Sequence, residues 1–224
     1  MVGGNTLYGR SHQQTAASER DFRPLCGGVA CLDFVNTVDR HGSTPDDDYF
    51  APGYANLLDW FEYAQLVDSD NATLLLRLAQ KQPRDAAAIR KRAQFLRTAI
   101  RGIVVDLASG GTPSPGDLVT LNAEVHRACA CGSFVAVDQV LQWRWTRNRE
   151  LDSLLWPIAR SAAELLSGAH LVRVRQCAAE ECELLFLDAS KNGSRRFCSA
   201  ASCGNATRVR RFRAHRETKA ATGA

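Results

Sequence analysis

The stretch that decides the fold of the C-terminal part reads CAAEECELLFLDASKNGSRRFCSAASC, from Cys177 to Cys203. It contains two cysteine pairs, Cys177 with Cys182 and Cys198 with Cys203, each pair spaced by four residues, and fifteen residues lie between the pairs. Two close pairs with enough chain between them for a hairpin match the tetrahedral four-thiolate coordination that zinc prefers. We therefore predict one structural Zn²⁺ ion, without the open coordination position that a catalytic zinc needs.

Residues between the pairs predict a small fold around the metal. Residues 183–188 (ELLFLD) are typical of a strand, Asn192-Gly193 is a strong hairpin-turn signal, and residues 195–198 would form the returning strand. A helix is expected to start near Ser202 or Cys203, where its N-terminus would favour the negative charge of the last two thiolates. Four buried thiols or a redox-active disulfide pair are the alternatives, but so short and polar a segment could hardly bury four cysteines without a metal. The prediction is a treble-clef-like finger made of a hairpin and a helix.

Positive charge is concentrated in the same part of the chain. Residues 1–170 carry 17 basic and 19 acidic side chains, whereas residues 171–224 carry 11 and 5. Such an asymmetry indicates an anionic partner, most often nucleic acid. A solvated helix whose arginines reflect only the arginine-rich composition is the alternative. Val209 and Phe212 share one narrow face of the expected helix, which can pack back on the hairpin. Arginine suits phosphates and guanine edges, and the candidate DNA contacts are Arg195, Arg196, Arg208, Arg210, Arg211 and Arg213.

The preceding part of the chain has the periodicity of a mainly helical domain with one antiparallel β-hairpin. Asp70 or Asn71 is expected to cap one helix, and Ser114 and Pro115 to open another, while Pro157 would kink or split the last helix. Helices are predicted over 29–39, 52–68, 70–80, 85–107, 115–129 and 149–167, and the hairpin over 134–146.

Taken together, these patterns divide the chain into four parts. We expect a disordered arm over 1–24, a helical regulatory or dimerisation domain over 25–170, the zinc finger over 171–216 and a tail over 217–224. No apolar run approaches the ~20 residues of a membrane span, and the start lacks the apolar core of a secretory signal. A cytoplasmic protein is therefore expected. Catalytic motifs such as a P-loop or G-x-S-x-G do not occur in the sequence, which argues against an enzyme.

Two features of the helical domain bear on its role. Asp33 and Asn36 could line a small-molecule effector pocket with Trp143 or Trp145, although a structural role in tying helices together is the favoured alternative. The hairpin that carries both tryptophans offers an open edge on which a second copy could pair, so we also expect a homodimer. The four further cysteines could complete a second metal-binding tetrad, but they are expected to be ordinary core residues: Cys26, Cys31, Cys129 and Cys131.

The finger resembles the CGNR zinc-finger family. The matching residues are FLD at 186–188, Ser190, Asn192, SRRFCS at 194–199 and CGN at 203–205. The family motif Cys-Gly-Asn-Arg ends in an arginine, and this chain has Ala206 at that position. LDFVNT at 32–37 and LLDW at 57–60 are similar to the ABATE domain that commonly precedes this finger.

The resemblance covers about 25–216 and implies a bacterial transcription regulator that binds DNA through the finger, with a sensory or dimerising N-terminal domain. A zinc-stabilised module that binds protein or RNA, without sequence-specific DNA binding, is the alternative.

Overall fold

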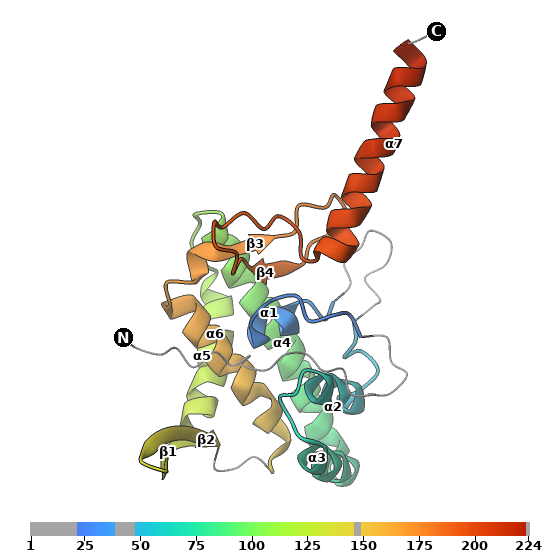
Figure 1. Cartoon of the computed structure of the whole chain (residues 1–224). Helices are drawn as coiled ribbons and strands as arrows, with labels where there is room; N and C mark the ends of the chain where they lie inside the picture. The colour runs from blue at the N-terminus through green and yellow to red at the C-terminus, as the bar shows by residue number, and fades with distance from the viewer. Residues whose placement is uncertain (1–21, 39–47, 146–148, 223–224) are drawn as a thin grey trace.

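The computed structural model describes residues 22–38, 48–145 and 149–222 (Figure 1). Most of the predicted disordered arm over 1–24 lies outside these residues. Its last part, however, is folded: the ring of Phe22 lies 5.1 Å from that of Tyr63 and 5.6 Å from that of Tyr49, measured between centroids. Phe22 is therefore packed against the helical domain, although the predicted arm extends to residue 24.

Helices dominate the described chain, and two short hairpins accompany them, as predicted. No helix among the described residues is long and apolar enough to cross a membrane. In chain order the elements are α1 (Ala30–Val35), α2 (Tyr54–Tyr63), α3 (Ser69–Lys81), α4 (Pro83–Ala108), α5 (Pro115–Ala130), β1 (Gly132–Val137), β2 (Val140–Trp145), a 3₁₀ turn (Leu151–Leu154), α6 (Leu155–Ser167), a second 3₁₀ turn (Leu171–Arg173), β3 (Val174–Gln176), β4 (Leu185–Leu187), a π-helical turn (Ala200–Gly204) and α7 (Asn205–Thr222).

Several predicted helix features are corrected by the structure. The helix predicted over 29–39 ends at Val35, the one over 52–68 ends at Tyr63, and the one over 149–167 starts at Leu155 after a 3₁₀ turn. The cap of α3 is Asp68, whose carboxylate accepts the N–H of Asn71 at 2.8 Å, so the cap lies before the predicted Asp70 or Asn71. Asp70 is instead in the first turn, where its charge complements the helix dipole. Pro157 does not split α6 because it is in the first turn, where its missing N–H would have had no helical partner.

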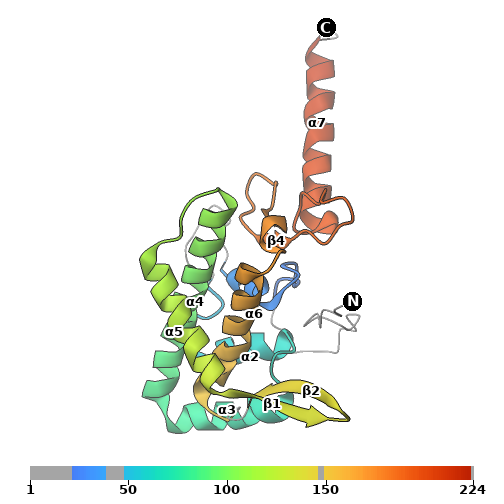
Figure 2. The same ribbon diagram turned by 90° about the vertical axis from the view of Figure 1, so that its left-hand side faces the viewer.

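The core of the helical domain forms around α1, which is buried along its whole length and contacts α4 and α6 (Figure 2). Phe34 of α1 packs against Trp60 and Phe61 of α2, with ring centroids 5.5 and 5.9 Å apart. Val174 and Leu185, from the two strands of the finger, belong to the same hydrophobic core. The finger is thus joined to the helical domain by shared packing, across the boundary that the sequence placed at residue 170.

The predicted hairpin in the helical domain is confirmed as β1 and β2, which pair antiparallel with Phe134 opposite Trp143 and Gly132 opposite Trp145. A Cβ atom on Gly132 would lie 1.9 Å from the ring of Trp143, so only glycine allows this ring to cover the strand. The hairpin is at one end of the molecule, and the strands of the finger are at the other (Figure 1).

The hairpin of the finger differs from the prediction. The strand β4 pairs with β3, which precedes the first cysteine pair, and residues 194–199 form no strand. Their backbone groups have other partners: the Arg195 N–H donates to the Asp188 carboxylate at 3.1 Å, and the Arg196 carbonyl accepts from Ala178 at 2.8 Å. The predicted turn is present, because Gly193 has a φ of +63°. Both cysteines of the first pair therefore lie in the loop between β3 and β4.

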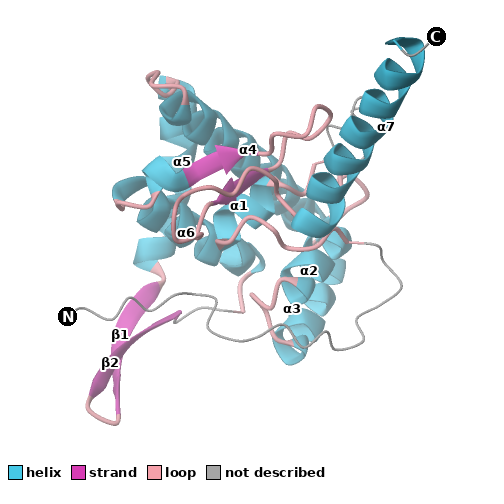
Figure 3. Cartoon of the chain, turned by 45° about the horizontal axis from the view of Figure 1, so that its top comes forward, coloured by secondary structure: helices cyan, strands magenta, loops and turns pink. Residues whose placement is uncertain are grey.

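The C-terminal helix α7 leads away from the rest of the molecule (Figures 1 and 3). Val209 and Phe212 are 39% and 62% exposed, so the prediction that they pack on the hairpin is wrong. The reason is the direction of the helix: the cysteine cluster holds only its base, and the axis then leaves the finger.

Candidate metal centre and nucleic-acid interface

The four predicted zinc ligands come together. Their Sγ atoms, from Cys177, Cys182, Cys198 and Cys203, all lie within 4.8 Å of one another. The Sγ atoms of Cys182 and Cys198 are 3.8 Å apart, and those of Cys198 and Cys203 are 3.5 Å apart. A tetrahedral zinc with Zn–S bonds of about 2.3 Å has ligand-to-ligand edges of about 3.8 Å. The cluster therefore has the dimensions of a four-thiolate zinc site, and these residues hold the structural zinc of the finger.

The surroundings of the cluster favour a bound cation. Cys177, Cys182 and Cys198 are buried together with Phe186. Burial raises the pKa of the Cys203 thiol to about 11 and also raises that of Cys182. At Cys177 burial opposes ionisation too, but the N–H groups of Cys198 and Ala179 lower the pKa below its usual value. Zinc supplies positive charge that compensates buried thiolates for the loss of water when it binds.

The Arg195 side chain lies against the finger itself, whereas a DNA contact was expected to face solvent. Its guanidinium donates to the carbonyls of Phe197 and Cys26, both at 3.0 Å, and to that of the zinc ligand Cys198. The same group lies over the ring of Phe186, 4.3 Å from its centroid. The side chain is thus engaged inside the finger and joins it to the N-terminal segment, so we leave Arg195 out of the proposed DNA-binding surface.

This geometry predicts that Arg195 positions the zinc ligands. Replacing it with glutamine (Arg195→Gln) removes the donors to the Cys198 and Cys26 carbonyls, and loss of a group that orients metal ligands typically lowers metal affinity by about 10- to 100-fold. Competition with a chromogenic zinc chelator measures the effect. Arg196→Gln is the matched control, because Arg196 is the exposed neighbour. Equal zinc affinities in the two variants would contradict a positioning role.

The other candidate DNA contacts are exposed to solvent. Arg196 lies in the loop before the second cysteine pair, and the remaining arginines surround α7. Arg210 is 51% exposed, and its guanidinium lies 3.8 and 3.9 Å from the carboxylates of Glu180 and Glu181 in the loop of the first cysteine pair. The exposed arginines of α7 are Arg208, Arg210, Arg211, Arg213 and Arg216.

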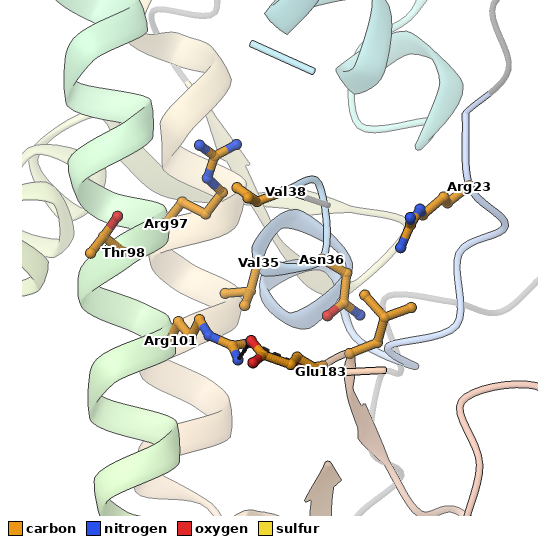
Figure 4. A pocket seen from close by; sticks show the side chains of 9 residues that line it. Arg23, Val35, Asn36, Val38, Arg97, Thr98, Arg101 and Glu183 are labelled. Carbon is orange, nitrogen blue, oxygen red and sulfur yellow. Dashed lines mark hydrogen bonds and ion pairs between the residues drawn. The ribbon is translucent and has the colours of Figure 1, made fainter. Parts of the chain in front are cut away.

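The four residues of the predicted effector pocket do not come together. The buried carboxylate of Asp33 accepts the Gly27 N–H at 2.7 Å, and burial raises its pKa to about 6. Asn36 donates to the Leu185 carbonyl at 2.8 Å and accepts the Leu185 N–H at 2.9 Å, so it extends the edge of β4. Trp143 and Trp145 lie on the hairpin at the opposite end (Figure 1). Asp33 and Asn36 thus have the structural role that was the favoured alternative, and Asn36 also lines a small cavity between α1, α4 and the finger (Figure 4).

The remaining four cysteines lie in four different surroundings. Cys31 is fully buried in α1, as expected of a core residue, whereas Cys129 is exposed on α5 and contradicts that expectation. Cys131 is half-buried beside Trp156. Cys26 packs against the zinc ligands, a place that its sequence spacing did not indicate because the contact joins residues far apart in the chain.

A helical domain that shares its core with a four-cysteine finger defines a two-part zinc-finger protein. Comparison with known families supports this class. Residues 28–169 match the ABATE family, described as "Putative stress-induced transcription regulator", and residues 173–216 match the CGNR zinc finger. The chain belongs to the ABATE family and carries a CGNR zinc finger after that domain. No curated protein matches the chain.

Proposed function

We propose that the chain is a bacterial transcription regulator that binds DNA through its finger, with α7 as the principal contact. One observation carries the proposal: α7 leaves the molecule directly after the zinc ligand Cys203 and exposes arginines on most of its surface. At 1.5 Å per residue, its 18 residues extend about 27 Å. A helix of this kind fits the major groove of B-DNA, and its guanidinium groups can reach phosphates on both sides.

The zinc site gives α7 a fixed base. Cys203 lies in the π-helical turn that leads into the helix, and the Thr207 hydroxyl donates to the Cys203 carbonyl at 2.8 Å. The Gly204 N–H donates to the Ser199 carbonyl at 2.9 Å, which closes the turn. Beyond this base the described residues of the helix are mostly exposed, with ion pairs from Arg210 to Glu180 and Glu181, and a mostly polar helix is marginally stable alone in water. Contact with DNA would supply the missing stabilisation.

A binding titration across salt concentrations tests this proposal. The zinc-loaded chain is added to a fluorescent DNA duplex, and the anisotropy gives the affinity at each salt concentration. We expect a steep fall with salt, because the arginines would release counterions from the phosphates. Salt-insensitive or absent duplex binding, with binding to RNA or a protein instead, would favour an interaction module.

We further propose that the helical domain pairs two chains through the β1–β2 hairpin. Phe134 and Leu141 lie on one face of this hairpin and are 67% and 68% exposed. The same face continues to Trp145, whose ring lies 5.7 Å from that of the buried Trp156. A two-stranded hairpin is marginally stable alone in water, so cover from a second copy would stabilise it. Two fingers held together would also bind DNA more tightly through effective concentration.

The dimer is tested by sedimentation of the full chain at tens of micromolar. We expect a dimer for the native chain and a monomer for the double variant Phe134→Ser, Leu141→Ser, because these changes place hydroxyls on the apolar face. Phe95→Ser is the control, since Phe95 is 66% exposed on α4, away from the hairpin. A native chain that sediments as a monomer would refute the dimer and leave effector sensing as the better account of this domain.

A further inference from the structure

A fifth thiol lies beside the zinc site. Cys26, in the segment before α1, packs against the cluster of zinc ligands and is half-buried, whereas the ligand Cys198 is buried. The Cys26 and Cys198 thiols share a hydrogen bond, and the Asn36 amide donates to the Cys26 sulfur from 3.9 Å. Cys26 is therefore next to the metal site but outside the set of four sulfur atoms that forms it.

Backbone contacts fix Cys26 and Cys198 relative to each other. One terminal nitrogen of Arg195 donates to the carbonyls of both cysteines, at 3.0 Å in the case of Cys26. The Gly27 carbonyl accepts the Leu187 N–H at 2.8 Å, so the segment that carries Cys26 is also bonded to β4. The two sulfur atoms are thus kept together by interactions of the folded chain on both sides of their contact.

A fifth thiol has no place in the coordination of a structural zinc, which is almost always four-coordinate. Two thiols in contact can instead form a disulfide, and an oxidant attacks the more exposed of them first. Of the two, Cys26 is the more exposed. We propose that Cys26 is an oxidisable thiol, which forms a disulfide with Cys198 when a hydroperoxide oxidises it and thereby releases the zinc.

The reaction consumes one hydroperoxide, such as hydrogen peroxide, in two steps. The Cys26 sulfur attacks one peroxide oxygen and the O–O bond breaks, which leaves a sulfenic acid on Cys26 and water formed from the other oxygen and the thiol proton. The Cys198 thiolate then attacks the Cys26 sulfur, the S–O bond breaks, and the departing hydroxide takes a proton from solvent. The two sulfurs lose two electrons in total, the peroxide gains them, and two water molecules form.

Formation of this disulfide removes one ligand from the zinc. A site left with three thiolates binds zinc more weakly, because one of the four Zn–S bonds is lost. Release of the metal would free the base of α7, since the ligand Cys203 leads directly into that helix. The consequence for DNA binding rests on the proposed function, whereas the oxidation and the release of zinc do not.

The first test treats the zinc-loaded full chain with hydrogen peroxide in the absence of reductant. A chromogenic chelator follows the released zinc, and tandem mass spectrometry of the alkylated, digested chain locates the disulfide. We expect a Cys26–Cys198 disulfide that forms with the same time course as zinc release. Release with a disulfide between zinc ligands only, release without a disulfide, or retention of zinc at millimolar peroxide would each overturn the proposal.

The second test compares Cys26→Ser with Cys129→Ser, a control that removes an exposed cysteine outside the cluster. Untreated, both variants should bind one zinc as the native chain does. Under peroxide we expect Cys26→Ser to release zinc at least about tenfold more slowly than the native chain and Cys129→Ser at the native rate, because the remaining thiols of the cluster all coordinate zinc. Native release from Cys26→Ser, or a folded Cys26→Ser chain that binds no zinc, overturns the proposal. Should Cys26→Ser fail to fold, the disulfide of the native chain decides.

DNA affinity is then measured before oxidation, after it, and after reduction with added zinc. A fall in affinity that reduction and zinc reverse supports the coupling to DNA binding, and an unchanged affinity overturns that coupling. A zinc-loaded chain that forms the disulfide under peroxide but never binds DNA would refute the proposed function and leave the oxidisable thiol standing.

Discussion

Loss of the zinc is expected to unfold the finger and to detach α7 from its base. A structural zinc contributes an apparent free energy of about 10–16 kcal/mol, comparable to the whole stability of a small domain. The four ligands join the β3–β4 loop to the turn before α7, and the apolar cluster around them is small. Cys182→Ser should therefore abolish stoichiometric zinc binding, and elemental analysis measures this directly.

Limited proteolysis of the same variant shows where structure is lost. We expect rapid cleavage within residues 188–222, while the helical domain stays folded. Its thermal stability should nevertheless fall, because Val174 and Leu185 of the finger belong to its core. Cys129→Ser is the control, since Cys129 is exposed and outside the cluster. A Cys182→Ser chain with full zinc content, or with native resistance to protease, would contradict the account of the metal site.

The zinc site was predictable because its information is local. Ligand spacing alone identifies Cys177, Cys182, Cys198 and Cys203, and the structure places their sulfur atoms at tetrahedral distances. The helices were predictable for the same reason, since apolar periodicity and capping residues act within a few turns. The errors at this level are shifted helix ends: the cap of α3 is Asp68, and α1 ends at Val35 because Val38 pairs with Asp48 in a β-bridge.

Contacts between distant segments could not be predicted in this way. The sequence 174–176 (VRQ) has no strand pattern long enough to detect, yet it pairs with β4 because the helical domain holds it in place. In the sequence, Arg195 cannot be distinguished from an exposed basic residue. In the structure its guanidinium donates to the Cys26 carbonyl, 169 positions away in the chain. Asn36 bonds Leu185 over a separation of 149 positions.

The predicted effector pocket was wrong because its residues are brought to opposite ends of the fold. An aromatic side chain such as Trp143 is typical of a pocket wall. In the structure, however, its ring covers Gly132 and lies under Arg160, whose guanidinium carbon is 5.1 Å from the ring centroid. The small cavity that contains Asn36 is lined instead by residues of α1, α4 and the finger, among them Arg101 and Leu184. A cavity depends on how elements pack, which no local pattern records.

DNA binding is expected to depend on the arginines of α7. Replacing Arg208, Arg210, Arg211 and Arg213 with alanine removes four exposed positive charges from the helix. A hydrogen bond to a charged group contributes about 1.5–3 kcal/mol, so loss of several should weaken duplex binding at least a hundredfold, by rough estimate. The slope of log affinity against log salt should flatten by about 0.9 for each phosphate that the variant no longer neutralises. Zinc content should be unchanged.

The decisive measurement compares this variant with a control that loses the same charge. The control replaces Arg77, Lys81, Arg84 and Lys91 of α3 and α4 with alanine; all four are exposed on the helical domain. Duplex anisotropy is recorded for the native chain and both variants over a range of salt concentrations. The account predicts that only the α7 variant loses affinity and salt dependence. Native affinity in the α7 variant, or an equal loss in both variants, would contradict a DNA-binding surface on α7.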